Sequence, residues 1–395
     1  MAVYIQKGTR QYWQAISALF LGSVAAFGLE YCVQPVIPLL TRDFNLSPSI
    51  ASLAMSCGTG GMALAMIFIA GSAGMLDRKK TMSIALSVSA ILAVLMAISP
   101  DYYLILVLRL IQGFLLAAFP SLALAYISEE FSPDIVGLVV GIYVSGTTIG
   151  GLLGRLVLSV LTDLFSWRIG LGVLGVFFFN ISIGFYFVLI KSRRHVPSKT
   201  WSTGFVRELG VTLRNKKLIK IYIIAFVACG SFVAMYNYIA FPLITPPYNL
   251  SQTAVGALFT VYLVGILSST LMGVMSDKYG CGKILSFSIG IMLIGAVITL
   301  MPDLIAKIAG LAIFTFGFFG THSTACSWTG KSCKSDKAQG SALYMLFYYV
   351  GSSVIGTAGG LFLSNYNWPG LIMMITIILC GALLLSARLT IAEEF

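Results

Sequence analysis

Residues 14–40 read QAISALFLGSVAAFGLEYCVQPVIPLL, an apolar run whose single charged residue is Glu30. About 20 apolar residues in a helix suffice to cross a bilayer, so this run predicts a transmembrane span. Glu30 is the one carboxylate in the body of an expected span, because the other 13 Asp and Glu lie in loops, tails or span ends. A charge at that depth is costly and usually functional. A neutral or Arg-paired Glu that serves only helix packing is the alternative.

The composition is that of an integral membrane protein. Of 395 residues, 58% are hydrophobic and 10% charged, whereas a soluble domain has about 25% charged residues. The apolar runs are continuous, which excludes the alternating strands of a membrane β-barrel. The seven Cys form no CxxC or Cys/His cluster, so neither a disulfide framework nor a metal site is expected. A phosphate-binding G-x-x-x-x-G-K-[ST] is also missing from the sequence, and no cofactor is expected.

Twelve apolar spans are expected, at residues 14–40, 50–74, 82–99, 103–127, 135–161, 168–190, 217–245, 253–275, 284–301, 304–327, 338–363 and 369–390. With a cytoplasmic N-terminus, 20 of the 25 Lys and Arg fall on the cytoplasmic side, three outside and two within spans. This excess predicts that both termini are cytoplasmic, in a multi-pass protein of the cell's inner (plasma) membrane. It also explains the net charge of +11 without a nucleic-acid partner.

A basic cytoplasmic linker, residues 191–216, is expected to separate an N-terminal six-helix bundle, 1–190, from a C-terminal one, 217–395. A short amphipathic helix is expected in the linker near residues 205–213. The halves share local sequence: NLS occurs at 45–47 and 249–251, and YVSGTT at 143–148 is similar to YYVGSS at 348–353. The nearly constant offset suggests an ancestral duplication of six spans, a construction common in transporters.

Two motifs resemble the major facilitator superfamily. Residues 273–280, GVMSDKYG, match its loop pattern G-x-x-x-D-[RK]-x-G through Gly273, Asp277, Lys278 and Gly280. The fourth expected span carries R-x-x-Q-G through Arg109, Gln112 and Gly113. The resemblance covers essentially the whole chain. It implies an all-α membrane fold of twelve helices in two pseudo-symmetric six-helix bundles, with alternating access to a central site, and no enzymatic activity.

The loop at residues 71–80 is a degenerate copy of the loop motif. In the family the motif Asp caps a neighbouring helix and pairs with basic residues, which links two spans. A one-residue gap gives Asp77 this role, followed by Arg78, whereas an ungapped alignment places Asp77 opposite Gly280. A charged turn without a linking role is the alternative reading.

The fifth expected span contains Gly146, Gly150, Gly151 and Gly154. Such glycines permit close helix contact and local bending. The pattern resembles the fifth-span motif of proton-coupled drug exporters, in particular the bacterial YnfM-like branch of the drug–proton antiporters. It lacks the Gly-Pro pair usual in that motif, which weakens the inference of export over uptake.

Glu30 and Arg109 are expected at similar depths in spans that line the cavity of this family. We therefore expect them to be neighbours that couple to proton movement. Arg155 is expected to bind an anionic group of the substrate, to join the Glu30–Arg109 pair, or to reach the outer interface. Further substrate-binding candidates, each of which could instead serve helix packing, are Gln34, Asn180, Tyr236, Asn237, Tyr238 and His322.

These features predict a monomeric secondary transporter in the lipid bilayer that exports a small organic molecule or drug in exchange for protons. Two intramembrane Arg leave open an exporter of a zwitterionic or anionic metabolite, such as a sugar, an amino-acid derivative or a metallophore. Proton symport for uptake keeps the same residue roles. A non-transporting membrane receptor is the alternative from another class.

Overall fold

The computed structural model describes residues 4–194, 210, 213–333 and 337–394. The described residues are almost entirely helical and contain no β-strand, although Ile5 and Phe131 form one isolated bridge. Of the linker helix expected near residues 205–213, only 210 and 213 are described, so this expectation lies almost wholly outside the described residues.

Eleven segments of the described chain are long and apolar enough to cross a membrane. The last, Gly340–Ile391, has 52 residues, or about 78 Å of helix, more than twice the thickness of a bilayer core. It consists of two helices that meet at Asn367, where φ is 55°. The twelve expected spans thus correspond to these eleven segments, and the all-helical membrane fold is confirmed.

The chain forms two compact units. Unit 1 comprises residues Met1–Val36 and Cys57–Thr203, and unit 2 comprises Ile37–Ser56 and Gly204–Phe395. Relative to the expected bundles 1–190 and 217–395, residues 37–56 cluster with the second unit, and the expected linker 191–216 is divided between the two units.

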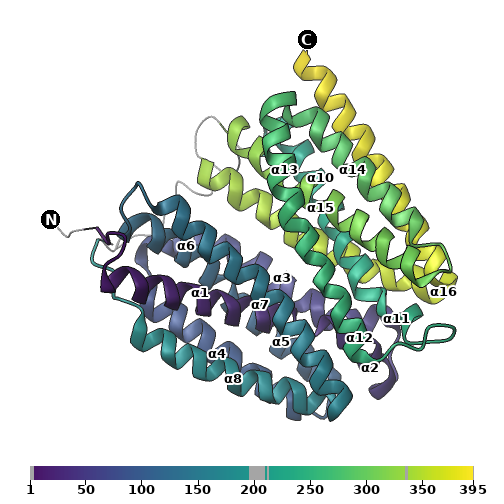
Figure 1. The fold of residues 1–395 in the computed structure, drawn as a ribbon, viewed down its shortest axis with the longest axis horizontal. Coiled ribbons are helices and arrows are strands. Elements are labelled where there is room, and N and C mark those ends of the chain that lie inside the picture. The colour runs from purple at the N-terminus through teal and green to yellow at the C-terminus, as the bar shows by residue number, and fades with distance from the viewer. Residues whose placement is uncertain (1–3, 195–209, 211–212, 334–336, 395) are drawn as a thin grey trace. The chain divides into compact units, whose positions relative to one another are not determined.

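Unit 1 holds the helices that carry Glu30, Arg109 and Arg155. Within it α1 packs on α7 and α8, and α4 packs on α8 and α5 (Figure 1). Its helices are α1 Arg10–Tyr31, the 3₁₀ turn η1 Gln34–Val36, α3 Pro48–Ser72 from Cys57 onward, the 3₁₀ turn η2 Ala73–Met75, α4 Arg78–Ile98, α5 Tyr102–Leu116, α6 Ala118–Glu130, α7 Val136–Leu164 and α8 Trp167–Val188.

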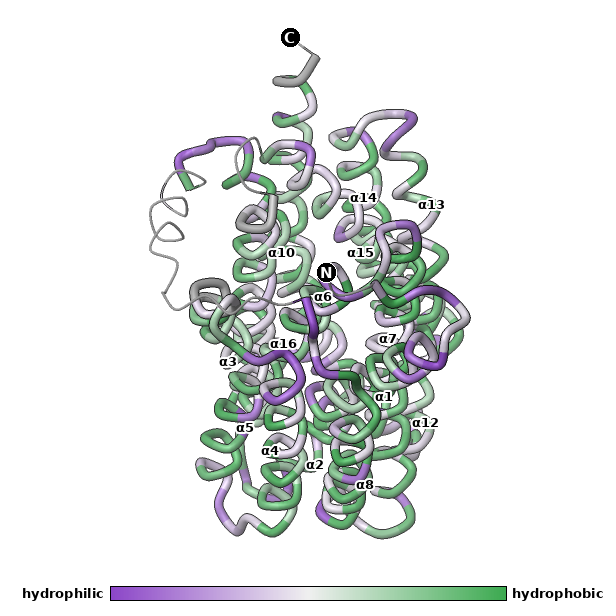
Figure 2. The backbone as a smooth tube through the Cα atoms, turned by 90° about the vertical axis from the view of Figure 1, so that its left-hand side faces the viewer, coloured by the Kyte–Doolittle hydropathy of each residue, from purple (hydrophilic) through white to green (hydrophobic). Residues whose placement is uncertain are grey.

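Unit 2 is built around α10 and α16, which pack against each other, and around a second pair, α14 and α15. Its elements are α2 Ile37–Asp43, the first part of α3, α10 Lys216–Tyr238, α11 Ala240–Leu243, α12 Gln252–Ala257, the 3₁₀ helix η3 Leu258–Tyr262, α13 Leu263–Tyr279, α14 Cys281–Ile298, α15 Leu304–Ser332 and α16 Lys337–Glu394. Hydrophobic residues cover most of the helical length, and hydrophilic residues gather at turns and helix ends (Figure 2).

Short polar side chains determine where many helices begin. Each accepts a hydrogen bond from a backbone N–H in the first helical turn, a group that otherwise lacks a partner. Helix starts capped in this way follow Thr9, Asp77, Asp101, Ser166, Asn215, Ser251 and Asp303.

Glu130, the last residue of α6, holds the segment that follows α8. Its Oε1 accepts hydrogen bonds from the Ser192 hydroxyl at 2.5 Å and from the backbone N–H groups of Arg193 and Arg194, each at 2.8 Å. The Glu130 carbonyl accepts a further hydrogen bond from the N–H of Ile5 at 2.8 Å. One buried residue therefore joins the N-terminal segment and the residues after α8 to the end of α6.

Candidate functional site

The structure brings Glu30 and Arg109 together in the interior of unit 1. Glu30 lies in the last turn of α1 and Arg109 in α5, and both are at most 1% exposed. Arg109 Nη2 is 3.6 Å from Glu30 Oε1. Neither carboxylate oxygen of Glu30 accepts a hydrogen bond from the described residues. The two groups thus form a buried ion pair without a hydrogen bond.

Arg109 is instead held by the backbone of α1 and by Gln112. Its Nη1 donates to the Leu29 carbonyl at 3.1 Å and to Gln112 Oε1 at 2.5 Å, and its Nη2 donates to the Glu30 carbonyl at 2.6 Å. Gln112 Nε2 donates to the carbonyl of Ser89 on α4 at 2.7 Å. The guanidinium presents its donors in a fixed fork, and these partners position it independently of the charge on Glu30.

Gly58 on α3 forms one wall of this ion pair. A Cβ at Gly58 would lie 2.5 Å from Arg109 Nη2 and 2.6 Å from Glu30 Oε1. Gly113 allows α5 to reach this wall, because a Cβ there would lie 2.6 Å from the carbonyl carbon of Gly58. The three motif residues therefore act together. Arg109 supplies the guanidinium, Gln112 accepts a hydrogen bond from it, and Gly113 allows the close contact between α5 and α3. Sequence reasoning missed Gly58, because the run CGTGG at residues 57–61 indicates close helix packing but not which side chains meet there.

Arg155 and Gln34 also meet in unit 1. Arg155 Nε donates to Gln34 Oε1 at 2.9 Å, and Nη1 donates to the Gly151 carbonyl at 2.9 Å. The guanidinium carbon lies 4.6 Å from the centre of the Tyr31 ring. Arg155 is 3% exposed, so its side chain lies in the interior of the unit.

The glycines of the fifth span bring α7 close to α1. A Cβ at Gly146 would lie 2.8 Å from the Phe20 carbonyl oxygen, and one at Gly154 would lie 2.5 Å from the Gly28 carbonyl oxygen. Gly150 approaches the backbone of Val24 in the same way. These glycines therefore set the separation of α1 and α7, the helices that carry Glu30 and Arg155.

The candidates on α10 make separate contacts within unit 2. The hydroxyl of Tyr236 is 2.7 Å from that of Thr315, and Tyr238 donates to Ser52 Oγ at 2.8 Å. Asn237, the residue between these two tyrosines in the sequence, is fully buried. These contacts join α10 to α15 and to the first part of α3.

His322 on α15 belongs to an aromatic cluster in unit 2. Its Nδ1 is 2.8 Å from the hydroxyl of Tyr344, and its ring stacks on Phe318 with centroids 6.1 Å apart. Its hydrogen-bonding partner is therefore a tyrosine on α16.

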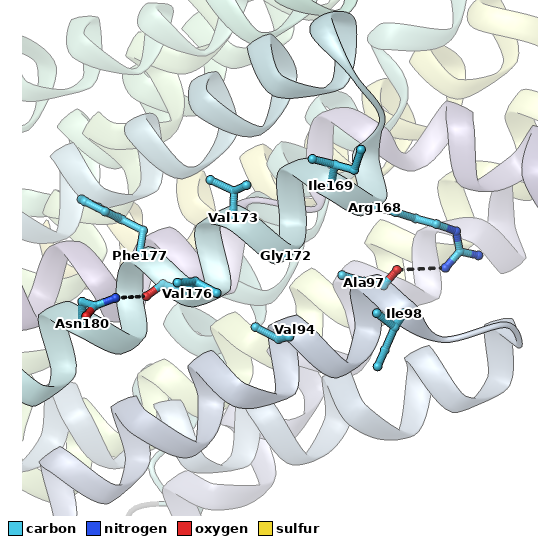
Figure 3. Close-up of a pocket in the computed structure, with 10 residues that line it drawn as sticks. All are labelled: Val94, Ala97, Ile98, Arg168, Ile169, Gly172, Val173, Val176, Phe177 and Asn180. Atoms are coloured by element: carbon cyan, nitrogen blue, oxygen red, sulfur yellow. Dashed lines mark hydrogen bonds between the residues drawn. The ribbon is translucent and has the colours of Figure 1, made fainter.

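Asn180 lies apart from the other candidates of unit 1. It is exposed, and its Nδ2 donates to the Val176 carbonyl at 2.8 Å. It lines an apolar groove between α4 and α8 (Figure 3). The structure does not bring Asn180 to Glu30, Arg109 or Arg155.

In the first loop motif, Asp77 caps a helix and Arg78 forms an ion pair with another helix. Asp77 caps its own helix by accepting a hydrogen bond from the N–H of Lys80 at 3.0 Å. Arg78 forms the ion pair between helices: Nη2 lies 2.7 Å from Glu129 Oε1, and Nε donates to Oε2 at 3.3 Å. Arg78 therefore links α4 to α6.

In the second copy, the motif Asp itself forms the link. Asp277 Oδ1 on α13 lies 2.7 Å from Lys331 Nζ on α15. Gly280, with φ of 91°, joins α13 to α14, a backbone conformation that glycine adopts without strain. The amine of Lys278 lies 5.2 Å from the centre of the Tyr279 ring. At Gly273 a Cβ would make an ordinary contact, 3.7 Å from Ser323 Oγ, so the packing there does not require glycine.

Comparisons with known proteins identify the family of the chain. A family model described as Major Facilitator Superfamily matches residues 19–242 and 224–394. The chain is 41% identical to a Bacillus subtilis (strain 168) protein described as the uncharacterized MFS-type transporter YybF, over 98% of this chain and 96% of that protein. It is 37% identical to the inner membrane transport protein YnfM of Escherichia coli (strain K12), over 98% and 93%.

Two solved transporters share the fold at 14% identity. One is the nucleoside transporter NupG, with a TM-score of 0.77 over 95% of this chain and 99% of that one. The other is an inward-facing bacterial homologue of the human lysosomal transporter Spinster, with a TM-score of 0.73 over 98% and 96%.

Proposed function

The chain belongs to the major facilitator superfamily and is a membrane transporter, and from this premise we propose that it exports a small organic molecule in exchange for protons. The observation that carries the proposal is the environment of Glu30. Its carboxylate is buried in a span, accepts no hydrogen bond from the described residues and lies 3.6 Å from Arg109. Buried ionisable groups in membrane spans commonly mark proton relays.

Glu30 can exchange a proton without disturbing Arg109. Protonation removes the negative charge and leaves the site with the positive charge of Arg109. The hydrogen bonds of Arg109 to the carbonyls of Leu29 and Glu30 and to Gln112 do not involve the Glu30 carboxylate. The hydrogen bonds that position the Arg109 guanidinium are therefore available in both protonation states of Glu30, and protonation changes only the net charge of the site.

Coupling requires that the two charge states favour different orientations of the transporter. A ligand shifts a conformational equilibrium only by its differential affinity for the two states. In the proposed cycle, protonated Glu30 stabilises one orientation and bound cargo stabilises the other. The energy comes from the proton gradient, without a cofactor, and the transporter acts in the inner membrane with both termini in the cytoplasm. Kinship with YnfM, described as an inner membrane transport protein, supports this location.

The test is proton movement in liposomes that contain a pH-sensitive dye. Wild type, Glu30→Gln and Asp134→Asn are reconstituted, and pooled cationic, acidic and zwitterionic cargos are added. Asp134→Asn removes an exposed carboxylate of a loop and serves as the matched control. Cargo-dependent proton flux in wild type and Asp134→Asn, lost in folded Glu30→Gln, is the expected result.

Full coupled flux in Glu30→Gln would overturn the role of Glu30. The sign of the flux separates export by antiport from uptake by symport, and the active pool identifies the cargo class. Counterflow of any cargo excludes a non-transporting receptor. Cargo counterflow without proton flux would contradict proton coupling while leaving the transporter assignment intact.

A further inference from the structure

Two pockets lie along the same pair of helices in unit 1, and the proposed function uses neither. The outer pocket has a volume of about 770 Å³ and includes Val94 and Val176. The inner pocket has a volume of about 460 Å³ and includes Lys80 and Phe187. Both are formed by α4 and α8, so together they make a groove along these helices, here called the α4–α8 groove. Figure 3 shows its outer half.

The groove exists because the backbones of α4 and α8 approach closely between rows of larger side chains. A Cβ at Gly175 would lie 2.7 Å from Val94 Cγ2 and 3.0 Å from the Ala90 carbonyl oxygen. On either side, Ile98 and Phe177 remain largely exposed, at 73% and 56%. Exposed apolar side chains on a membrane span are suited to contact with lipid chains.

The inner end of the groove is basic and carries hydroxyl groups. Lys80 is exposed and lines the inner pocket together with Ser83 and Tyr186. The amine of Lys79 lies 5.0 Å from the centre of the Tyr186 ring, at the same end. The neighbouring Arg78 is already paired with Glu129.

Besides Glu129, which is paired with Arg78, Asp77 is adjacent to this end, and its carboxylate caps α4. The charges of Lys79 and Lys80 therefore exceed that of the Asp77 carboxylate, and the inner end of the groove has a net positive charge. The distribution of Lys and Arg along the chain assigns this end to the cytoplasmic leaflet.

The groove becomes apolar away from the lysines. The Ser182 hydroxyl donates to the Phe179 carbonyl at 2.7 Å and lies 2.9 Å from the Ser87 hydroxyl, so both are engaged within the helix pair. The outer half is lined almost wholly by hydrocarbon side chains, with Asn180 bonded to its own helix. From Lys80 to Val94 along α4 is about 21 Å, more than the roughly 15 Å depth of one leaflet. Basic and hydroxyl groups followed by hydrocarbon over this length complement an anionic lipid.

We propose that the α4–α8 groove binds an anionic phospholipid of the cytoplasmic leaflet. Its phosphate lies at Lys79 and Lys80, and one acyl chain follows the groove toward Val94. Anionic headgroups favour clusters of basic residues at the membrane surface. Arg168, at the far end, is engaged by the carbonyls of Ala97 and Ser99, so the headgroup binds at the inner end.

The experiment is native mass spectrometry of the full-length protein in detergent. The probes are phosphatidylglycerol and phosphatidylcholine with identical acyl chains. We expect wild type to retain phosphatidylglycerol at least about fivefold more than phosphatidylcholine. Lys79→Ala/Lys80→Ala should abolish this preference. The matched control, Lys216→Ala/Lys217→Ala, removes two adjacent lysines at the start of α10 and should preserve it.

Ser87→Phe tests the acyl-chain part of the site. It fills the groove without changing charge, and we expect it to lower the binding of both lipids. The lysine pair is at the surface and remains a valid test if Ser87→Phe does not fold. Equal binding of the two lipids by wild type, or a preference unaffected by Lys79→Ala/Lys80→Ala, would overturn the proposal. A protein dimer lost in Ser87→Phe would assign the groove to a second copy and overturn it too.

Discussion

Arg78 donates two hydrogen bonds to Glu129, one from Nη2 at 2.7 Å and one from Nε at 3.3 Å. The Arg78 side chain is 5% exposed and that of Glu129 is 28% exposed. A bidentate pair of this kind fixes geometry as well as charge. It fastens the start of α4 to the end of α6, next to the lysines of the α4–α8 groove.

We predict that Arg78→Ala lowers the free energy of unfolding by about 2 kcal/mol, because it leaves Glu129 without its main partner. Glu129→Gln should cost less, since Glu129 is partly exposed. Thermal unfolding of the detergent-purified variants measures both. The double variant should be less destabilised than the sum of the two singles, and strict additivity would contradict a direct interaction.

Gly58→Ala should abolish coupled transport while leaving the fold intact. The added methyl group would lie 2.5 Å from Arg109 Nη2 and 2.6 Å from Glu30 Oε1, so the ion pair must move apart. Proton flux in liposomes is the measurement. Gly290→Ala, at a position with nothing within 4 Å, is the matched control and should retain full flux. Normal flux in Gly58→Ala would show that the geometry of the pair is not needed for coupling.

Arg109→Lys should reduce transport by about tenfold or more, even though it keeps the positive charge. A lysine amine offers three donors on one nitrogen, so it cannot reproduce the fork that reaches the carbonyls of Leu29 and Glu30 and Gln112 Oε1. Cargo uptake into vesicles measures the loss. Arg42→Lys, at a side chain 81% exposed, should behave as wild type. Unchanged uptake in Arg109→Lys would mean that charge alone suffices.

Arg155→Ala and Asn180→Ala should separate two candidate cargo residues. Arg155 is buried beside Gln34 and Tyr31, in the unit that holds Glu30, so its loss should weaken acidic cargos selectively. Asn180 lines the α4–α8 groove, and its loss should leave every cargo unaffected. Dye-quenching titrations with acidic and cationic cargos provide the comparison. Equal weakening of both cargo classes by Arg155→Ala would point to a packing role instead.

The sequence was sufficient for the membrane fold because spans follow from hydropathy and length alone. The proximity of Glu30 and Arg109 could also be predicted, from their similar depth together with the family resemblance, which implies that spans one and four line the cavity. The break between the last two spans was expected near residues 363–369. The structure places it at Asn367, a residue type that tolerates positive φ.

Other contacts could not be predicted, for physical reasons. Glu129 lies 51 residues from Arg78, and no local pattern connects them. The position of Asn180 on an exposed face could not be predicted, because α8 is apolar on every side. Hydropathy therefore does not distinguish the interior face of α8 from its lipid face. The importance of Gly58 depends on which side chains meet there, and this is decided by packing rather than by the glycine itself.

The junction at Glu130 shows how far the sequence beyond α8 is free to change. Its carboxylate binds the backbone N–H groups of Arg193 and Arg194 and the hydroxyl of Ser192. Backbone groups are common to every amino acid except proline, which lacks the N–H. Evolutionary drift at positions 193 and 194 can therefore replace either arginine without loss of the anchor, provided that proline is avoided. An epitope tag inserted after residue 194 would start from a fixed point on the scaffold.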